Sequence, residues 1–257
     1  MRKFAAISSA FAVLLGVVGF FLRRTELNSI FDPQSGLALR FAGISLALGG
    51  LTVAVLAALL VSLLVIGALK VRSGFSGAFG SASSVPVFVV ALGAVFFAAG
   101  ALALLARVFK APAFSIVNGV LAIFGLASAI SVFVVFYCSY KLRDGSELQL
   151  CSIVPIAFLC FWLILAYRQR AADPVLLDYI YEILALILCI LGFYFTAGFA
   201  FGRVKPRRAL FCTNGAIYMS IVTLADSHPL PQMLFFVGSI IVMLVCSILL
   251  ASNCEKM

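Results

Sequence analysis

The sequence predicts an all-α membrane protein, a polytopic transmembrane bundle of about eight helices that fills residues 1–257 as a single integral membrane domain. Hydrophobic residues make up 65% of the chain and charged residues 11%, whereas soluble domains average roughly 45–50% and ~25%. Such a chain has too little polar surface to cover a water-facing globule. The apolar runs are long and lack the alternation of a membrane β-barrel, so the spans are expected to be helices in contact with the lipid bilayer.

Eight apolar runs are long enough, or nearly so, to cross ~30 Å of hydrocarbon. They lie approximately at residues 4–22, 39–69, 85–106, 114–138, 151–167, 175–202, 209–225 and 231–251. The first run is expected to be an uncleaved span rather than a signal peptide. It is followed by GFFLRR, which offers no small-residue cleavage site.

Two features inside the spans concern helix packing. The seventh run is the most polar, and it contains Thr213, Asn214, Ser220 and Thr223. These side chains either form hydrogen bonds between helices or line a polar cavity. Glycines at helical spacing, in the 93–100 segment and at Gly198 with Gly202, predict close approach of neighbouring helices.

The distribution of basic residues predicts that both termini are cytoplasmic. Eleven Lys and Arg residues fall on the amino-terminal side of eight spans and seven on the other side, and cytoplasmic loops carry the excess. The RVKPRR stretch supplies most of this bias, and its side chains are predicted to contact anionic lipid headgroups (Arg203, Lys205, Arg207 and Arg208). Membrane topology thereby accounts for the net charge of +9, and no run of bases interleaved with aromatics indicates nucleic acid binding.

The search for catalytic and metal-binding motifs is negative. The seven cysteines are scattered without a CxxC pair, and a single histidine is too few for an ordinary zinc site. The chain has no HExxH or GxSxG motif, and the glycine-rich stretch at residues 73–84 lacks the lysine of a P-loop. That stretch predicts a flexible or irregular linker. We therefore expect no cofactor and no metal, and an enzyme is the least favoured class.

Two segments open alike, with Asp-Pro after an arginine-bearing loop: FDPQSGLALRFAGISLALGG at 31–50 and ADPVLLDYIYEILALILCILG at 172–192. Asp at the N-cap and Pro at the first helical position are typical helix starts. The recurrence is compatible with two four-helix halves, residues 1–145 and 146–257, arranged as parallel repeats. Chance use of a common helix start is the alternative.

RRTELNSIFDPQSGL, DPVLLDYIYEILALI and FGRVKPRR resemble segments of a family of multi-pass bacterial membrane proteins, mostly from anaerobic Firmicutes. The resemblance extends over most of the chain. It implies a location in the bacterial cytoplasmic membrane, and it implies no activity.

The best candidate site is acidic and lies at the outward-facing side of the predicted topology. Asp178 and Glu182 are four residues apart on the sixth predicted span, so they share one helix face about 6 Å apart along the axis. Tyr181 flanks Glu182, and the last outer loop adds Asp226 and His228. Carboxylates inside a span commonly mark ion or substrate paths, and histidine responds to pH.

A structural interpretation of the same residues is also available. The uncharged run from Ile183 to Phe201 is nineteen residues, or ~28 Å of helix, which alone nearly crosses the bilayer. Asp178 and Glu182 would then lie in the outer headgroup layer, Tyr181 would be an interfacial anchor, and His228 would be a solvated loop residue.

The working hypothesis is a transporter, or a membrane-embedded binding subunit, for a small solute or ion that binds at this acidic site. The alternative is a non-catalytic structural, sensory or assembly protein, whose partner is another membrane protein or a second copy of the chain.

Overall fold

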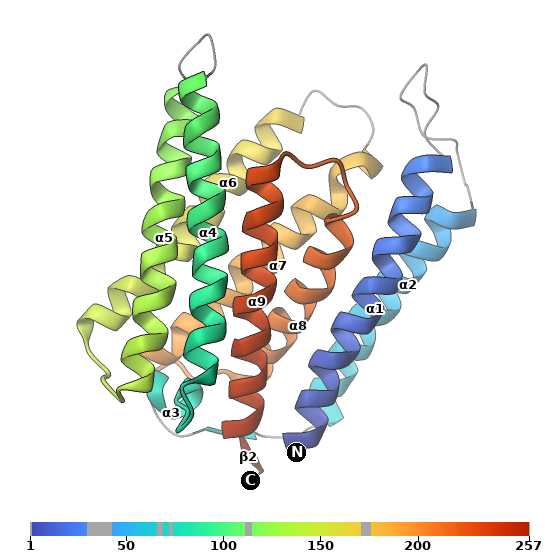
Figure 1. Cartoon of the computed structure of the whole chain (residues 1–257). Helices are drawn as coiled ribbons and strands as arrows, with labels where there is room; N and C mark the ends of the chain where they lie inside the picture. Colours follow the sequence, from blue (N-terminus) through green and yellow to red (C-terminus); the bar gives the residue numbers. More distant parts are fainter. Residues whose placement is uncertain are drawn as a thin grey trace.

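The computed structural model describes residues 2–29, 43–65, 69–71, 74–110, 115–170 and 176–256. Within these ranges the chain is almost entirely helical, which confirms the predicted class (Figure 1). The elements are α1 (Arg2–Ser29), α2 (Gly43–Val65), β1 (Leu69–Lys70), α3 (Phe75–Phe79), α4 (Val85–Lys110), α5 (Ile116–Tyr140), α6 (Ser146–Arg170), α7 (Leu176–Ala200), α8 (Pro206–Thr223), α9 (Leu230–Asn253) and β2 (Glu255–Lys256). The two short strands pair antiparallel. The two Asp-Pro dipeptides, at residues 32–33 and 173–174, lie outside the described residues.

Among the described helices, seven are long and apolar enough to cross a membrane: α1, α2, α4, α5, α6, α7 and α9. The protein is therefore a multi-pass integral membrane protein. The remaining long helix, α8, corresponds to the most polar predicted span. It packs against α1, α2, α7 and α9, and nearly every residue from Ala209 to Thr223 is buried. Because its neighbours separate it from lipid, α8 can carry polar side chains that a lipid-facing helix could not.

The two ends of the bundle differ, and we name them by the chain termini. Both termini lie at the same end in Figure 1, which we call the terminal end. This end also carries α3 and the connections at residues 141–145 and 201–205. The opposite end, which we call the far end, holds the last turns of α1, the first turns of α2 and α7, and the α8–α9 connection at residues 224–229.

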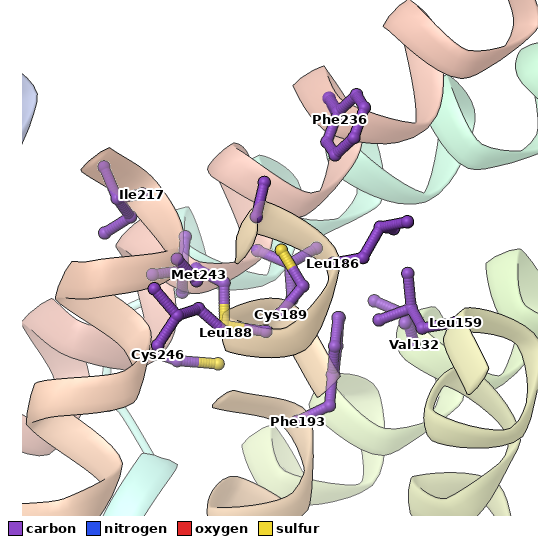
Figure 2. Close-up of a cluster of buried hydrophobic side chains, with 14 of the residues drawn as sticks. Val132, Leu159, Leu186, Leu188, Cys189, Phe193, Ile217, Phe236, Met243 and Cys246 are labelled. Atoms are coloured by element: carbon purple, nitrogen blue, oxygen red, sulfur yellow. The ribbon is translucent and has the colours of Figure 1, made fainter. Parts of the chain in front are cut away.

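The hydrophobic core surrounds α7. Figure 2 shows buried side chains from five helices meeting there: Val132, Leu159, Leu186, Leu188, Cys189, Phe193, Ile217, Phe236, Met243 and Cys246. The predicted close approach holds for α4 and α9. A Cβ atom on Gly93 would lie 2.9 Å from Val242 Cγ2, and one on Gly100 would lie 2.9 Å from the Pro231 carbonyl oxygen.

Gly202 does not pack helices as the sequence suggested, because α7 ends at Ala200 and Gly202 lies beyond it. Its φ is +71°, a left-handed conformation that glycine adopts readily. The Arg203 N–H then donates to the Gly198 carbonyl at 2.8 Å. This arrangement is the left-handed terminus with which many helices end.

The linker predicted at residues 73–84 is packed at its helical turn, whereas residues 82–84 are exposed and irregular as predicted. It contains the one-turn helix α3, whose Phe75 and Phe79 are each 2% exposed. The Asn253 amide, in the last turn of α9, donates to the carbonyl oxygens of Ala78 and Gly80 at 2.9 Å each. The two phenylalanines were the signal in the sequence, because exposed linkers rarely hold large aromatic side chains in this spacing.

Candidate functional site: a buried charge cluster at the far end

Helix α1 carries two charged residues into the protein interior. The first predicted span ended at residue 22, but α1 continues to Ser29. Arg23 is 0% exposed and Glu26 is 1% exposed. They are three residues apart, so they share one helix face, and Arg23 Nη1 donates to Glu26 Oε2 at 2.7 Å. Arg23 is one of the seven basic residues counted on the side opposite the amino terminus, where a loop position was expected, and that expectation is wrong because its side chain is buried within α1.

Asp226, in the α8–α9 connection, binds the same guanidinium. Arg23 Nε donates to Asp226 Oδ1 at 2.6 Å, and the Thr223 hydroxyl donates to Asp226 Oδ2 at 2.9 Å. Burial raises the pKa of the Asp226 carboxyl, while the Arg23 charge and the hydrogen bonds from Arg23 and Thr223 oppose that rise. Arg23 thus lies between two carboxylates, one from its own helix and one from the α8–α9 connection.

His228 extends the cluster through Thr223. Its Nε2 atom lies 3.1 Å from the Thr223 hydroxyl oxygen and 3.9 Å from Asp226 Oδ2. A hydroxyl has one proton, and Thr223 donates its proton to Asp226. His228 Nε2 must therefore carry a proton and donate it to Thr223. The histidine is tied to the arginine through two intervening side chains.

Helix α2 joins the cluster from the other side. The Ser45 hydroxyl, in the first turn of α2, donates to Glu26 Oε1 at 2.5 Å. A continuous series of hydrogen bonds accordingly runs from His228 through Thr223, Asp226, Arg23 and Glu26 to Ser45. It connects the α8–α9 connection, α1 and α2.

Helix α7 contributes one aromatic ring, that of Tyr181. The Arg23 guanidinium carbon lies 4.8 Å from the centroid of the Tyr181 ring, a favourable cation–π distance. Further from the far end, the hydroxyls of Thr52 and Tyr218 are 3.1 Å apart, which extends the polar region between α2 and α8.

The structure brings Tyr181, Asp226 and His228 together around Arg23. Glu182 follows Tyr181 in α7 and is 3% exposed. Tyr181 is 5% exposed, so the prediction that it is an interfacial anchor is wrong, and Glu182 is likewise buried inside the protein. The interpretation of His228 as a solvated loop residue is wrong for the same reason. Asp178 belongs to the first turn of α7, but its side chain lies outside the part of the chain that the structure describes.

Sequence reasoning missed Arg23, Glu26, Ser45 and Thr223 as site residues. A signal for the first two was present, since opposite charges three residues apart after an apolar run indicate a continuing helix with an internal ion pair. Nothing local indicated that Asp226 would be the second partner.

The chemistry available to the cluster is proton binding and ion pairing. Among the described residues, no group of three His, Cys, Asp or Glu side chains is placed to hold a metal ion, and the Arg23 guanidinium occupies the space between the two carboxylates. Asp226 and His228 are linked by one hydroxyl, that of Thr223.

The polar residues of α8 deeper in the bundle have a different role. The Asn214 amide donates to Ser8 at 3.1 Å and accepts from Ser247 at 2.8 Å, while Thr213 donates to carbonyls of its own helix. The two Asn214 hydrogen bonds join α8 to α1 and α9. They favour interhelical bonding over a polar cavity for this part of the predicted seventh span.

Comparisons with protein-family models, with curated proteins and with solved structures find no match to this chain. Function is therefore argued from the chemistry of the buried cluster.

Proposed function

We propose that this membrane protein transports or binds a small solute or ion, and that the Arg23 cluster is the element that responds to protons or cations. The observation that carries the proposal is the buried Arg23–Asp226 ion pair, joined through Thr223 to His228. Ionisable residues in a membrane interior are costly, and they usually mark ion, proton or substrate pathways.

The cluster supports this proposal because its bonds connect parts of the bundle that could move separately. Figure 1 shows α1 and α2 side by side at one edge of the bundle, and α2 has described contacts with α1 and α8 only. A proton on His228 would place a second positive charge 3.9 Å from Asp226, where it competes with Arg23 for the carboxylate. Protonation would thereby weaken the tie between α1 and the α8–α9 connection.

We also propose the orientation and location that follow from the charge distribution. The terminal end would face the cytoplasm of a bacterium, with the membrane being the cytoplasmic membrane. Exposed basic side chains at this end support the orientation: Lys141, Arg143, Arg203, Lys205 and Arg208. The burial of Arg23 removes one positive charge from the surface of the far end, which adds to the same bias.

The test is charge movement in proteoliposomes adsorbed on a solid-supported membrane, after jumps in pH or in sodium, potassium or ammonium concentration. We expect the wild-type protein to give a transient charge displacement for at least one of these jumps. Asp226→Asn and His228→Gln should abolish it, and Arg24→Gln should not, because Arg24 is an exposed neighbour of Arg23. No displacement in the wild type, or equal displacement in all variants, would contradict the proposal.

A second candidate function, an assembly partner in a membrane complex, is favoured by the outer face of α2. Small exposed residues recur on this face at helical spacing: Gly43, Ala47, Gly50, Ala54, Ala57 and Ala58. A Cβ atom added to Gly43 or Gly50 would meet nothing within 4 Å. Small residues in a membrane helix allow a second helix to approach closely. If assembly is the function, Gly50→Ile should dissociate a complex that survives purification of the wild type in mild detergent.

A further inference from the structure

A lipid-facing groove at the terminal end has a composition that points to a specific ligand. The groove measures about 500 Å³ and lies between α6 and α7. Its walls are Ile153 and Ile156 of α6 together with Tyr194, Phe195 and Ala197 of α7. This lining begins at Phe201, which directly follows α7 and lies at the rim. It ends at Tyr194, which is seven residues and ~10 Å deeper. A cleft of this size and lining fits part of an extended hydrocarbon chain.

Two basic residues stand at the rim of the groove. Arg203 and Lys205 line it where α7 ends, and both are exposed. The left-handed Gly202 turns the chain at this point, and the Arg203 N–H bonds to the Gly198 carbonyl at 2.8 Å. This turn fixes the backbone of Arg203 directly over the α7 wall. The described lining contains no carboxylate, so its charge is positive.

We propose that this groove binds one anionic phospholipid, with an acyl chain between α6 and α7 and the phosphate on Arg203 and Lys205. An apolar trough under two cations is complementary to a lipid that has a hydrocarbon tail and a net negative headgroup. A zwitterionic lipid fits less well, because its own ammonium or choline group would offset the attraction to the two cations. The proposal is independent of the function of the Arg23 cluster.

The groove separates the four basic residues of the 203–208 stretch into two pairs. Arg203 and Lys205 line it, whereas Arg207 and Arg208 belong to the first turn of α8 and do not. The two pairs carry equal charge at the same end of the bundle. They therefore offer a matched comparison between a specific site and general attraction to an anionic surface.

The test is native mass spectrometry of the full-length protein in detergent, titrated with phosphatidylglycerol or with phosphatidylcholine of the same acyl chains. We expect the wild type to retain one phosphatidylglycerol in preference to phosphatidylcholine. The double variant Arg203→Gln/Lys205→Gln should bind phosphatidylglycerol roughly thirtyfold more weakly, since each basic residue near a membrane surface strengthens binding roughly fivefold. Arg207→Gln/Arg208→Gln should remain within about twofold of wild type.

A groove-filling variant tests the acyl-chain half of the proposal. Ile153 is 44% exposed, so Ile153→Trp should fold and should block the trough without changing charge. It should reduce retention of phosphatidylglycerol. Three results would overturn the proposal: no preference for phosphatidylglycerol in the wild type, equal loss in the two double variants, or unchanged binding in Ile153→Trp.

Discussion

Both ends of the bundle carry arginines, but the surroundings of these arginines differ. At the far end, Arg23 is 0% exposed and is bonded to Glu26 and Asp226. At the terminal end, Arg203 and Arg208 are exposed. All three residues are arginines, so the difference in burial comes from the groups that surround each guanidinium. A buried guanidinium is tolerable only when carboxylates accompany it, whereas an exposed one needs only water and lipid headgroups. The comparison predicts how strongly each end depends on its charges.

Arg23→Met should have the largest effect on stability. It leaves Glu26 and Asp226 buried without their cation, and removal of one partner from a buried ion pair costs about 3–5 kcal/mol. The measurement is unfolding in detergent at neutral pH, with Arg24→Met as control. The loss should be smaller at acidic pH, where protonation neutralises Asp226, whose pKa is raised by burial. Equal unfolding free energies for the two variants would show that burial does not distinguish these neighbouring arginines.

Asn214→Leu should have an intermediate effect. Asn214 bonds to Ser8 and Ser247, and this buried network is uncharged. We expect a loss of about 1–2 kcal/mol, because neutral hydrogen bonds between membrane helices contribute modestly. The same unfolding assay measures it. A loss equal to that of Arg23→Met would mean that buried polarity, rather than buried charge, sets the cost.

Asp226→Asn should change the pH dependence of stability. Burial raises the pKa of Asp226 from its ordinary 3.8, so the folded protein holds this proton more tightly than the unfolded chain does. The resulting stability is fully present below the ordinary pKa and is lost as pH rises through the raised pKa, at no more than about 1.4 kcal/mol per pH unit. Across acidic pH the unfolding free energies of wild type and variant should diverge, because the wild type loses this stability as pH rises and the variant does not. Parallel curves would contradict it.

Arg208→Gln should have the smallest effect. Its side chain is exposed at the start of α8, and such substitutions usually change the unfolding free energy by less than about 0.5 kcal/mol. A larger loss in the same assay would indicate that the terminal end also relies on a specific ion pair.

Much of the fold could be predicted from the sequence. The long apolar runs predicted the seven apolar helices, because a helix that crosses lipid needs many consecutive hydrophobic residues. The polarity of the predicted seventh span corresponds to the central position of α8. The end of α1 was misplaced, since Arg23 and Arg24 read locally as the start of a loop. Its true extent depends on Asp226, which lies 203 residues away in the chain.

The candidate site was predicted in part. Asp226 and His228 were identified because acids and histidine are rare in this chain, and Tyr181 was identified because it flanks Glu182. The contact between Arg23 and Asp226 that joins them could not be found from local patterns, because helix packing alone brings α1 beside the α8–α9 connection. Whether two halves of the chain are repeats stays a prediction.

The central claim, that the cluster responds to protons, has a direct optical test. The chain has one histidine and one tryptophan, and Phe236 lies between them. Its ring centroid is 5.4 Å from that of His228 and 4.8 Å from that of Trp162. Trp162 emission, followed while the pH is lowered, should change in the wild type and stay flat in His228→Gln. Superimposable curves for the two proteins would contradict a proton-responsive cluster at His228.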